Sequence, residues 1–288
     1  MTVDLPARSV EAATRWAQQR LSGAGIDAAR AEARLLLRHA TGFSAERQVS
    51  APDAPLDRQQ LACLEAAVSR RSRREPMAQI LGRREFWSLD FEVTPDTLDP
   101  RPDSETVIEA ALAALDSRVP PYQILDLGTG TGCLLLALLS ELPAASGVGV
   151  DIAPGAARVA RKNAERLGFS RRACFIAGDW ITALDGRFDL VLCNPPYVPT
   201  DVIETLEPEV ARFEPRRALD GGADGLGAYR QLIPDLSRVV GAAGKVVIEV
   251  GIGQADAVAE ILKRSGFGGQ ARHADLAGIE RCISAIPD

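Results

Sequence analysis

The sequence predicts an α/β fold with a mainly parallel sheet, and three observations support that prediction. From residue 122 onward, short apolar runs that suit buried strands alternate with segments of helical spacing. The apolar run Gln123–Leu127 leads into a glycine-rich turn, Gly128–Gly132, and then into a helix, an order that suits ligand binding at a helix N-terminus. The run Phe188–Cys193 stops at two prolines, which cannot continue a central strand because they lack a backbone N–H. Strands that alternate with helices imply right-handed crossovers, so both turns should lie at the edge of the sheet where ligands bind.

Residues 1–75 are expected to form a small helical domain. Apolar side chains recur there at helical spacing in three segments, and the second segment spans about residues 27–40. Asp27 and Asp57 precede the second and third helices and are the expected N-caps. The basic run Arg70–Arg74 closes the third helix. We expect it to be a solvated helix end, and a nucleic-acid contact is the alternative.

Residues 76–100 are expected to form a β-hairpin that joins the helical domain to the rest of the chain. Pro76 breaks the preceding helix because it cannot donate a backbone hydrogen bond. The aromatic side chains of the hairpin, Phe86, Trp87 and Phe91, are expected in a core. A contact with substrate is the alternative for these rings.

Residues 101–288 are expected to form the main domain. It begins with a helix for which Asp103 or Ser104 is the expected N-cap. Seven strands are expected, at residues 123–127, 146–151, 173–180, 188–193 and 245–251 and near residues 270–275 and 280–286. Helices are expected between them at residues 133–142, 153–167, 227–240 and 253–263.

The chain of 288 residues has a net charge of −6 that is unevenly distributed. The first 90 residues hold 14 arginines and 11 acidic residues, whereas the remainder holds 19 basic and 28 acidic residues. An acidic main body argues against a protein that tracks the phosphate backbone of a nucleic acid. We therefore expect no direct binding of nucleic acid.

The five cysteines and two histidines are scattered, with no Cys-x-x-Cys pair, so no metal site is expected. Free thiols suit a reducing compartment. The N-terminal residues lack the apolar run of a signal peptide, and the run Cys133–Leu139 is far shorter than the ~20 residues that cross a bilayer. These features predict a soluble, cytoplasmic protein, and we expect it to be a monomer.

Asn194, Pro195, Pro196 and Tyr197 stand at the end of the fourth predicted strand. The Asn amide and the carbonyls of the proline pair can accept hydrogen bonds from a planar NH2 group, and the Tyr ring can lie against that group. This arrangement suits the binding of a carboxamide or an exocyclic amine. The alternative is a plain turn that ends a strand.

The second predicted strand ends at Asp151, where a carboxylate can accept hydrogen bonds from both hydroxyls of a ribose. An NAD enzyme would share this acid and the glycine turn. Two features argue against NAD: Asp126 lies at the end of the first strand, where it can meet a ligand ammonium, and the fourth strand ends in Asn-Pro-Pro-Tyr. The combination resembles class I methyltransferases, which use S-adenosyl-methionine and have a Rossmann-like, mostly parallel seven-stranded sheet.

Longer segments resemble the release-factor glutamine methyltransferases of the HemK/PrmC family. The resemblance runs from about Val10 to Ile283 and is most specific in the segments EFWS and PRPDSE, residues 85–88 and 100–105. Asp99 departs from it, since the family pattern has an apolar residue before Pro-Arg-Pro. The resemblance implies an N-terminal helical bundle for substrate recognition, a linking hairpin and a catalytic domain that binds S-adenosyl-methionine. The implied reaction is methylation of the Gln side-chain amide in the Gly-Gly-Gln motif of class 1 peptide-chain release factors.

The same resemblance implies roles for single residues. The implied cofactor-binding residues are Gly128, Thr129, Gly130, Thr131, Gly132, Asp151, Asp179, Trp180 and Asn194. The implied catalytic residues are Asn194, Pro195 and Tyr197, and Pro196 joins them in binding the substrate amide. Structural roles are the alternatives: Gly130 can serve packing, Trp180 can be a core residue and Asp151 can cap a helix.

Two other functions remain open at this level. A methyltransferase that acts on the exocyclic amine of adenine or guanine in a nucleic acid would use the same Asn-Pro-Pro-Tyr turn. The basic N-terminal region favours this alternative, and the acidic main body argues against it. The second alternative is a protein that holds S-adenosyl-methionine without transferring its methyl group. The intact Asn-Pro-Pro-Tyr turn argues against that function.

Overall fold

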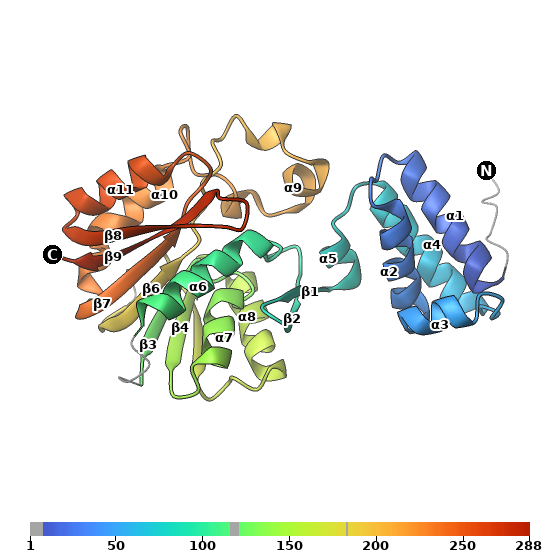
Figure 1. Ribbon diagram of the computed structural model, residues 1–288, viewed down its shortest axis with the longest axis horizontal. Coiled ribbons are helices and arrows are strands. Elements are labelled where there is room, and N and C mark those ends of the chain that lie inside the picture. The colour runs from blue at the N-terminus through green and yellow to red at the C-terminus, as the bar shows by residue number, and fades with distance from the viewer. Residues whose placement is uncertain (1–7, 116–120, 183) are drawn as a thin grey trace. The chain divides into compact units, whose positions relative to one another are not determined.

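The computed structural model describes residues 8–115, 121–182 and 184–288, and these residues form two compact units (Figure 1). The first unit ends at Gly82 and also includes Glu207–Phe213. The second unit comprises Arg83–Leu206 and Glu214–Asp288. Within the described ranges, no helix has both the length and the apolar character that a membrane crossing needs.

The first unit is a bundle of helices. They are α1 (Val10–Gly23), α2 (Ala29–Thr41), α3 (Ala45–Ser50), α4 (Arg58–Ser72), α5 (Met77–Leu81) and α9 (Pro208–Phe213). Helices α1, α2 and α4 pack around an apolar core in which Leu21, Leu37 and Leu64 are fully buried. The apolar spacing therefore predicts this helical bundle correctly, because one face of each helix is removed from water.

Two of the expected helix starts have different outcomes. Asp57 caps α4 in a reciprocal capping box with Gln60, as predicted. Asp27 does not cap α2, since Ala28 occupies the N-cap position and no side chain caps that end. Helix α3 was not predicted from the sequence. Ser44 begins it by accepting a hydrogen bond from the backbone N–H of Arg47.

The basic run at the end of α4 is solvated only in part, since Arg73 is exposed while Arg71 and Arg74 form ion pairs. Arg71 is buried and forms ion pairs with Glu32 and Glu209, with N–O distances of 2.6 and 2.7 Å. Arg74 pairs with Glu207 and Glu209 at 2.9 and 2.7 Å. The expectation of a solvated end was wrong for Arg71 and Arg74, because acidic residues distant in sequence pack against them. Helix α9 is attached to the first unit through these pairs.

The first unit continues beyond the expected boundary at residue 75. Met77–Leu81 forms helix α5 instead of the start of a hairpin, and Ile80 belongs to the core of the first unit. Pro76 occupies the N-cap position of α5. A proline next to a helix start costs little because the first N–H groups of a helix have no intrahelical partner. Pro76 therefore separates two helices, α4 and α5. A helix-breaking role predicts the end of α4 but not the start of α5.

The hairpin is correspondingly shorter than expected and consists of β1 (Arg83–Phe86) and β2 (Leu89–Glu92), which pair antiparallel. Phe86 and Phe91 are buried and meet edge to face, with ring centroids 6.3 Å apart. Trp87 is only partly buried, because it occupies the turn with a left-handed backbone at φ 52°. Two of the three rings are therefore core residues, as predicted, and Trp87 lies at the edge of that core.

The second unit contains the seven-stranded sheet that the sequence predicts. Its strands are β3 (Gln123–Leu127), β4 (Ser146–Asp151), β5 (Ala173–Ala177), β6 (Phe188–Cys193), β7 (Val240–Glu249), β8 (Phe267–Ala274) and β9 (Glu280–Pro287). Their order is β5-β4-β3-β6-β7-β9-β8, and β9 runs antiparallel to both of its neighbours while the other pairs are parallel. The chain direction therefore brings the carboxyl ends of β3 to β7 to one edge.

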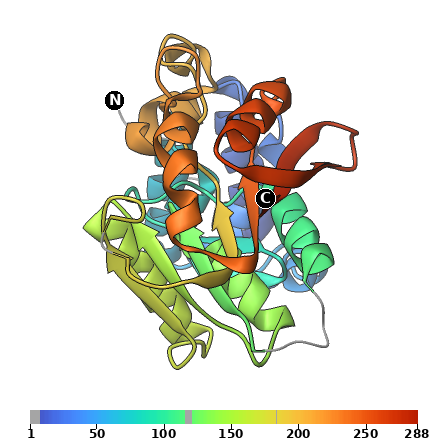
Figure 2. The same cartoon turned by 90° about the vertical axis from the view of Figure 1, so that its left-hand side faces the viewer.

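Helices cover both faces of this sheet. They are α6 (Glu105–Ala114), α7 (Cys133–Glu141), α8 (Pro154–Arg166), α10 (Gly227–Leu232) and α11 (Ala255–Arg264). On β6, Leu190 and Leu192 face the core that contains α6 to α8, whereas Val191 and Cys193 face the core that contains α10 and α11. This alternation follows the two-residue repeat of a strand that is buried on both faces. Figures 1 and 2 show α11 lying against β8 and β9, in red.

The helix expected over residues 227–240 is interrupted. It ends as α10 at Leu232, and a 3-10 segment, Ile233–Arg238, follows before β7 begins at Val240. Pro234 explains the interruption, because it cannot supply the backbone N–H that an α-helix requires at that point. Strand β7 consequently begins five residues earlier than the expected start at residue 245.

Candidate active site

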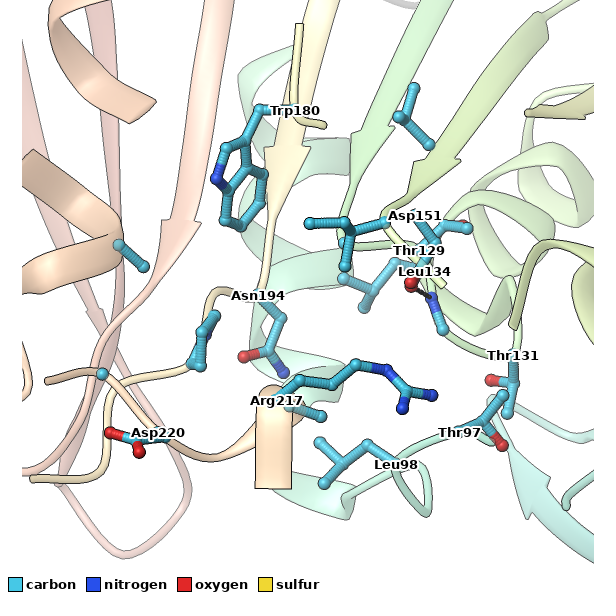
Figure 3. A pocket seen from close by; sticks show the side chains of 18 of the residues that line it. Thr97, Leu98, Thr129, Thr131, Leu134, Asp151, Trp180, Asn194, Arg217 and Asp220 are labelled. Carbon is cyan, nitrogen blue, oxygen red and sulfur yellow. Dashed lines mark hydrogen bonds between the residues drawn. The ribbon is translucent and has the colours of Figure 1, made fainter. Parts of the chain in front are cut away.

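A cavity of about 480 Å³ opens at the carboxyl ends of β3, β4, β5 and β6 (Figure 3). Every residue that lines it belongs to the second unit. This edge is where open α/β sheets bind ligands, and the volume is typical of a site for a small molecule.

The glycine turn after β3 forms one wall of the cavity. Gly128 and Gly130 have left-handed backbones, with φ of 74° and 54°, which an L-residue adopts at a cost. A Cβ on Gly128 would lie 3.5 Å from the backbone oxygen of Asn194 and 3.7 Å from the ring of Trp180. The missing side chain therefore leaves a space between the turn, the end of β6 and the indole ring.

Gly132 does not line this cavity. It is the N-cap of α7 with φ 81°, and a Cβ there would stand 3.2 Å from both Ala160 and Phe175. Such contacts are tighter than ordinary van der Waals distances. The glycine at this position therefore allows α7 to pack closely against its neighbours.

Asp151 at the tip of β4 lines the cavity and holds two backbone segments. Its carboxylate accepts hydrogen bonds from the N–H of Gly130 at 2.9 Å and from the N–H of Ala153 at 2.8 Å. The second bond lies just before α8, where Ala153 is the N-cap and no side chain caps the helix, so the alternative of a helix-capping role for Asp151 is wrong. The first bond fixes the carboxylate against the glycine turn.

Asp126 lies beneath the turn and is 1% exposed. One carboxyl oxygen accepts a hydrogen bond from the Thr129 hydroxyl at 2.6 Å, and the other has no hydrogen-bond partner among the described residues. Burial raises the pKa of Asp126 to about 7, against the lowering effect of the Thr129 hydrogen bond. A buried acid with an unpaired oxygen is thus placed behind the cavity wall.

Trp180 also lines the cavity, with its ring close to Gly128, and Asp179 beside it is exposed. The backbone of Trp180 is left-handed at φ 45°, which is unusual for a bulky residue. Figure 3 shows its indole ring projecting beside Asn194. The ring also packs against the apolar core of that face, so it combines a core contact with a cavity surface.

The four residues after β6 separate into two groups. Asn194 and Pro196 line the cavity, whereas Pro195 is buried and Tyr197 lies outside the cavity lining. The Tyr197 hydroxyl donates to Oε1 of Glu249 at 3.3 Å. The roles predicted for these residues in substrate binding remain predictions.

The predicted cofactor and substrate residues are brought together to a large extent. Those that line the cavity are Gly128, Thr129, Gly130, Thr131, Asp151, Asp179, Trp180, Asn194 and Pro196. Those that do not are Gly132, Pro195 and Tyr197. The lining residues come from the ends of four different strands, so their proximity depends on the parallel sheet.

Ser104 and Glu249 join this site although the sequence indicates no such role. Ser104, expected as a helix cap, makes no capping hydrogen bond. Its hydroxyl donates to Oε2 of Glu249 at 2.6 Å and accepts from Nδ2 of Asn194 at 3.2 Å. Ser104 and Glu249 are each 3% exposed, and burial raises the pKa of Glu249 to about 7.

A group of charged residues lies in and behind the cavity lining. Arg101 donates to both carboxyl oxygens of Glu214 at 2.7 Å, and burial raises the pKa of Glu214 to about 7. Asp99 is buried, with its Oδ1 3.8 Å from Nε of Arg84, and burial raises its pKa as well. Arg217 also lines the cavity (Figure 3). Sequence patterns alone did not indicate these pairings, which join distant segments.

Family models match two parts of the chain. A model described as PrmC N-terminal domain matches residues 12–82, and a model described as methyltransferase domain matches residues 119–240.

Curated relatives match most of the chain. A release factor glutamine methyltransferase of Rhodospirillum rubrum is 50% identical over 266 residues, which cover 92% of this chain and 81% of the relative. Proteins of the same name from Caulobacter vibrioides and Cereibacter sphaeroides are 42% and 43% identical, with 94% and 95% of this chain and 93% and 96% of the relatives covered.

Solved structures are similar in fold at low sequence identity. The crystal structure of the hMettl16 catalytic domain in complex with MAT2A 3′UTR hairpin 6 matches with a TM-score of 0.57 and 15% identity, over 76% of this chain and 81% of that chain. A methyltransferase from Pyrococcus furiosus matches with a TM-score of 0.50 and 16% identity, over 68% and 88% of the two chains. At these identities the match supports the fold alone.

Proposed function

This chain belongs to the release factor glutamine methyltransferase family, and from that premise we propose its reaction. It transfers a methyl group from S-adenosyl-methionine to the side-chain amide nitrogen of the Gln in the Gly-Gly-Gln motif of class 1 peptide-chain release factors. One observation carries the proposal. The amide of Asn194, a group suited to bind a carboxamide, lines the same cavity as the glycine turn, Asp151 and Trp180.

The cavity fits the proposed cofactor. The space that a Cβ on Gly128 would occupy is open to a ligand, and we propose that Asp151, which lines the cavity, accepts hydrogen bonds from the ribose hydroxyls. The ring of Trp180 offers a surface for an adenine, and the unpaired oxygen of Asp126 lies behind the wall that the glycine turn forms. When bound, S-adenosyl-methionine supplies an electrophilic methyl group on a sulfonium.

The difficult part of this reaction is the weak nucleophile. The lone pair of a carboxamide nitrogen is delocalised into its carbonyl. Oδ1 of Asn194 and the carbonyl of Pro195 would accept hydrogen bonds from the two substrate N–H groups, which raises the electron density on nitrogen and aims it at the methyl carbon. Holding two reactants in this geometry can supply ~7–11 kcal/mol of the barrier.

The proposed step balances without a strong base. The substrate nitrogen forms a bond to the methyl carbon, the carbon–sulfur bond breaks and its electron pair remains on sulfur. The nitrogen then loses one proton to water. Tyr197, which lies behind the turn with its hydroxyl on Glu249, is proposed to support the substrate from that side.

The proposed substrate acts in translation termination, so the proposal implies a cytoplasmic enzyme. The first unit overlaps the match to the PrmC N-terminal domain. We propose that this unit recognises the release factor. Arg71 and Arg74 already form ion pairs with glutamates of the first unit, so their charges are neutralised within the protein, whereas a nucleic-acid contact would need them free. They favour a protein substrate over the nucleic-acid alternative.

A competition assay tests the proposal. The purified protein and S-adenosyl-methionine with a labelled methyl group are offered a class 1 release factor, ribosomal RNA and duplex DNA in parallel. We expect label on the release factor alone, and no label on a factor whose motif is changed to Gly-Gly-Ala. Label on RNA or DNA with none on the release factor would refute the proposal.

A further inference from the structure

The Ser104 hydroxyl connects Asn194 to a buried carboxylate. Nδ2 of Asn194 lies 3.2 Å from Ser104 Oγ, and that oxygen lies 2.6 Å from Oε2 of Glu249. The hydroxyl of Tyr197 donates to the other oxygen of the same carboxylate at 3.3 Å. The connection joins three segments that are far apart in sequence: the 3-10 helix Pro102–Ser104 before α6, the end of β6 and the end of β7.

An ionised Glu249 fixes the direction of these hydrogen bonds. A carboxylate only accepts, so the single hydroxyl proton of Ser104 must point at Glu249 in a short, charge-assisted bond. The lone pairs of Ser104 Oγ then face Asn194. Only the NH2 end of the Asn194 amide can donate to them, and a rotated amide would place two acceptors against each other.

We propose that Ser104 and Glu249 are positioning residues that hold the Asn194 amide with Oδ1 turned toward the methyl-accepting nitrogen. This inference rests on the proposed function, in which Oδ1 accepts a hydrogen bond from the substrate amide. Because Nδ2 is held by Ser104, Oδ1 is turned away from that hydroxyl, and the side chain itself lines the cavity (Figure 3). An unconstrained Asn would present its NH2 group as readily, and that group would repel the substrate NH2.

The charge of Glu249 controls this arrangement. Burial raises its pKa to about 7, partly offset by the hydrogen bonds from Ser104 and Tyr197. The other titratable or charged groups that act on it, or are acted on by it, are Asp103, Arg281, Tyr229, Cys133, Cys193 and Cys282. A protonated Glu249 can donate to Ser104 Oγ, and the Ser104 proton can then turn to Asn194. The turnover rate should therefore rise as the pH passes through about 7.

Steady-state kinetics with a release factor test the inference. Ser104→Ala removes the link without removing a helix cap, since Ser104 makes no capping hydrogen bond. We expect kcat to fall about tenfold to a hundredfold, because Asn194 loses its oriented partner. The KM for S-adenosyl-methionine should stay within about twofold, because this bond does not act on cofactor binding. Ser104→Thr keeps the hydroxyl and should restore most of kcat.

Glu249→Gln tests the direction of the hydrogen bonds. Its amide NH2 can donate to Ser104, which releases the hydroxyl proton toward Asn194. We expect a loss of kcat similar to that of Ser104→Ala, and no remaining rise in kcat near pH 7. Glu214→Gln is the matched variant, because burial raises the pKa of that acid to about 7 as well. A pH profile that changes in Glu214→Gln and not in Glu249→Gln would overturn the inference.

A second readout does not depend on turnover. The side-chain NH2 of Asn194, assigned by its absence from the NMR spectrum of Asn194→Asp, should exchange slowly with water in the parent and in Ser104→Thr. It should exchange faster in Ser104→Ala. Ser140→Ala is the control, since the Ser140 hydroxyl donates to the carbonyl of Ala137 on α7, and this variant should leave exchange and kcat unchanged.

The two readouts separate failure of the inference from failure of the proposed function. If the parent does not methylate the release factor, the proposed function fails, while slow exchange that depends on Ser104 still supports the positioning of Asn194. If the parent is active and Ser104→Ala keeps full kcat, the inference fails and the function stands. Equal losses in kcat, cofactor affinity and thermal stability would indicate a merely structural role and would also overturn it.

Discussion

The backbone oxygen of Asn194 lies 3.5 Å from the point where a Cβ on Gly128 would stand. The ring of Trp180 lies 3.7 Å from the same point. These distances correspond to ordinary van der Waals contact, so a methyl group would fit there without a clash and would fill the space. The ends of β3 and β6 therefore enclose a volume that exists because residue 128 has no side chain.

Gly128→Ala is expected to weaken cofactor binding by about tenfold or more, which corresponds to ~1.4 kcal/mol. The added methyl would also occupy a left-handed backbone and reduce stability by roughly 1–2 kcal/mol. Gly168→Ala is the matched control, because Gly168 has φ 82° with nothing near its absent Cβ. Titration calorimetry with S-adenosyl-homocysteine should show weaker binding for Gly128→Ala alone, while both variants lose similar stability. Equal affinities would show that the ligand does not approach this glycine.

Asn194→Ala is expected to abolish turnover and to retain cofactor binding. The substituted residue loses the acceptor for the substrate amide, whereas the glycine turn and Asp151 keep their contacts with each other. Methyl transfer to a release factor and calorimetric binding of the cofactor measure the two effects separately. Turnover near that of the parent would refute the proposed mechanism.

Local patterns in the sequence predict the parts of the site that depend on chain direction. The glycine turn, Asp151 and Asn194 each follow a predicted strand, and parallel strands bring their carboxyl ends to one edge of the sheet. The spacing of small and polar residues next to a strand was sufficient for these positions. The distances between these residues depend on the strand order, which the local patterns do not give.

Side-chain partners from distant segments could not be predicted in the same way. Ser104 and Glu249 are separated by 145 positions, and nothing in either local pattern indicates the other. Ser104 has the residue type and place of a helix cap, but the buried carboxylate competes successfully for its hydroxyl. Likewise, Arg71 has the place of a solvated helix end, yet Glu32 and Glu209 surround it. In each case a tertiary contact outweighs a local preference.

Glu214→Gln is expected to flatten the dependence of stability on pH. The pKa of Glu214 in the folded protein, about 7, lies above the ordinary 4.5 because the carboxyl is buried. Between these values the folded protein keeps a proton that the unfolded chain has lost, so this residue's contribution to stability falls as the pH rises from 4.5 to about 7. Each unit of pKa difference contributes about 1.4 kcal/mol to this change.

Urea denaturation at several pH values measures the effect of Glu214→Gln. Asp126 and Glu249 also have pKa values raised to about 7, so the slope should decrease and not vanish. Glu85→Gln, which alters an exposed carboxyl, is the control and should keep the slope of the parent. An unchanged slope in Glu214→Gln would show that Arg101 keeps this acid ionised in the folded protein.

Arg71→Ala is expected to destabilise the first unit strongly. Glu32 and Glu209 would remain largely buried without their shared partner, and the loss of one member of a buried ion pair costs about 3–5 kcal/mol. Arg15→Ala is the matched control, because Arg15 pairs with Glu11 on the exposed surface of α1, where such a pair is worth less than about 1 kcal/mol. Hydrogen exchange should show faster opening of α1, α2 and α4 in Arg71→Ala.

Since residues 207–213 are held to this unit by Arg71 and Arg74, exchange in α9 should accelerate as well. Protection of α9 at the level of the parent would mean that these ion pairs do not hold it.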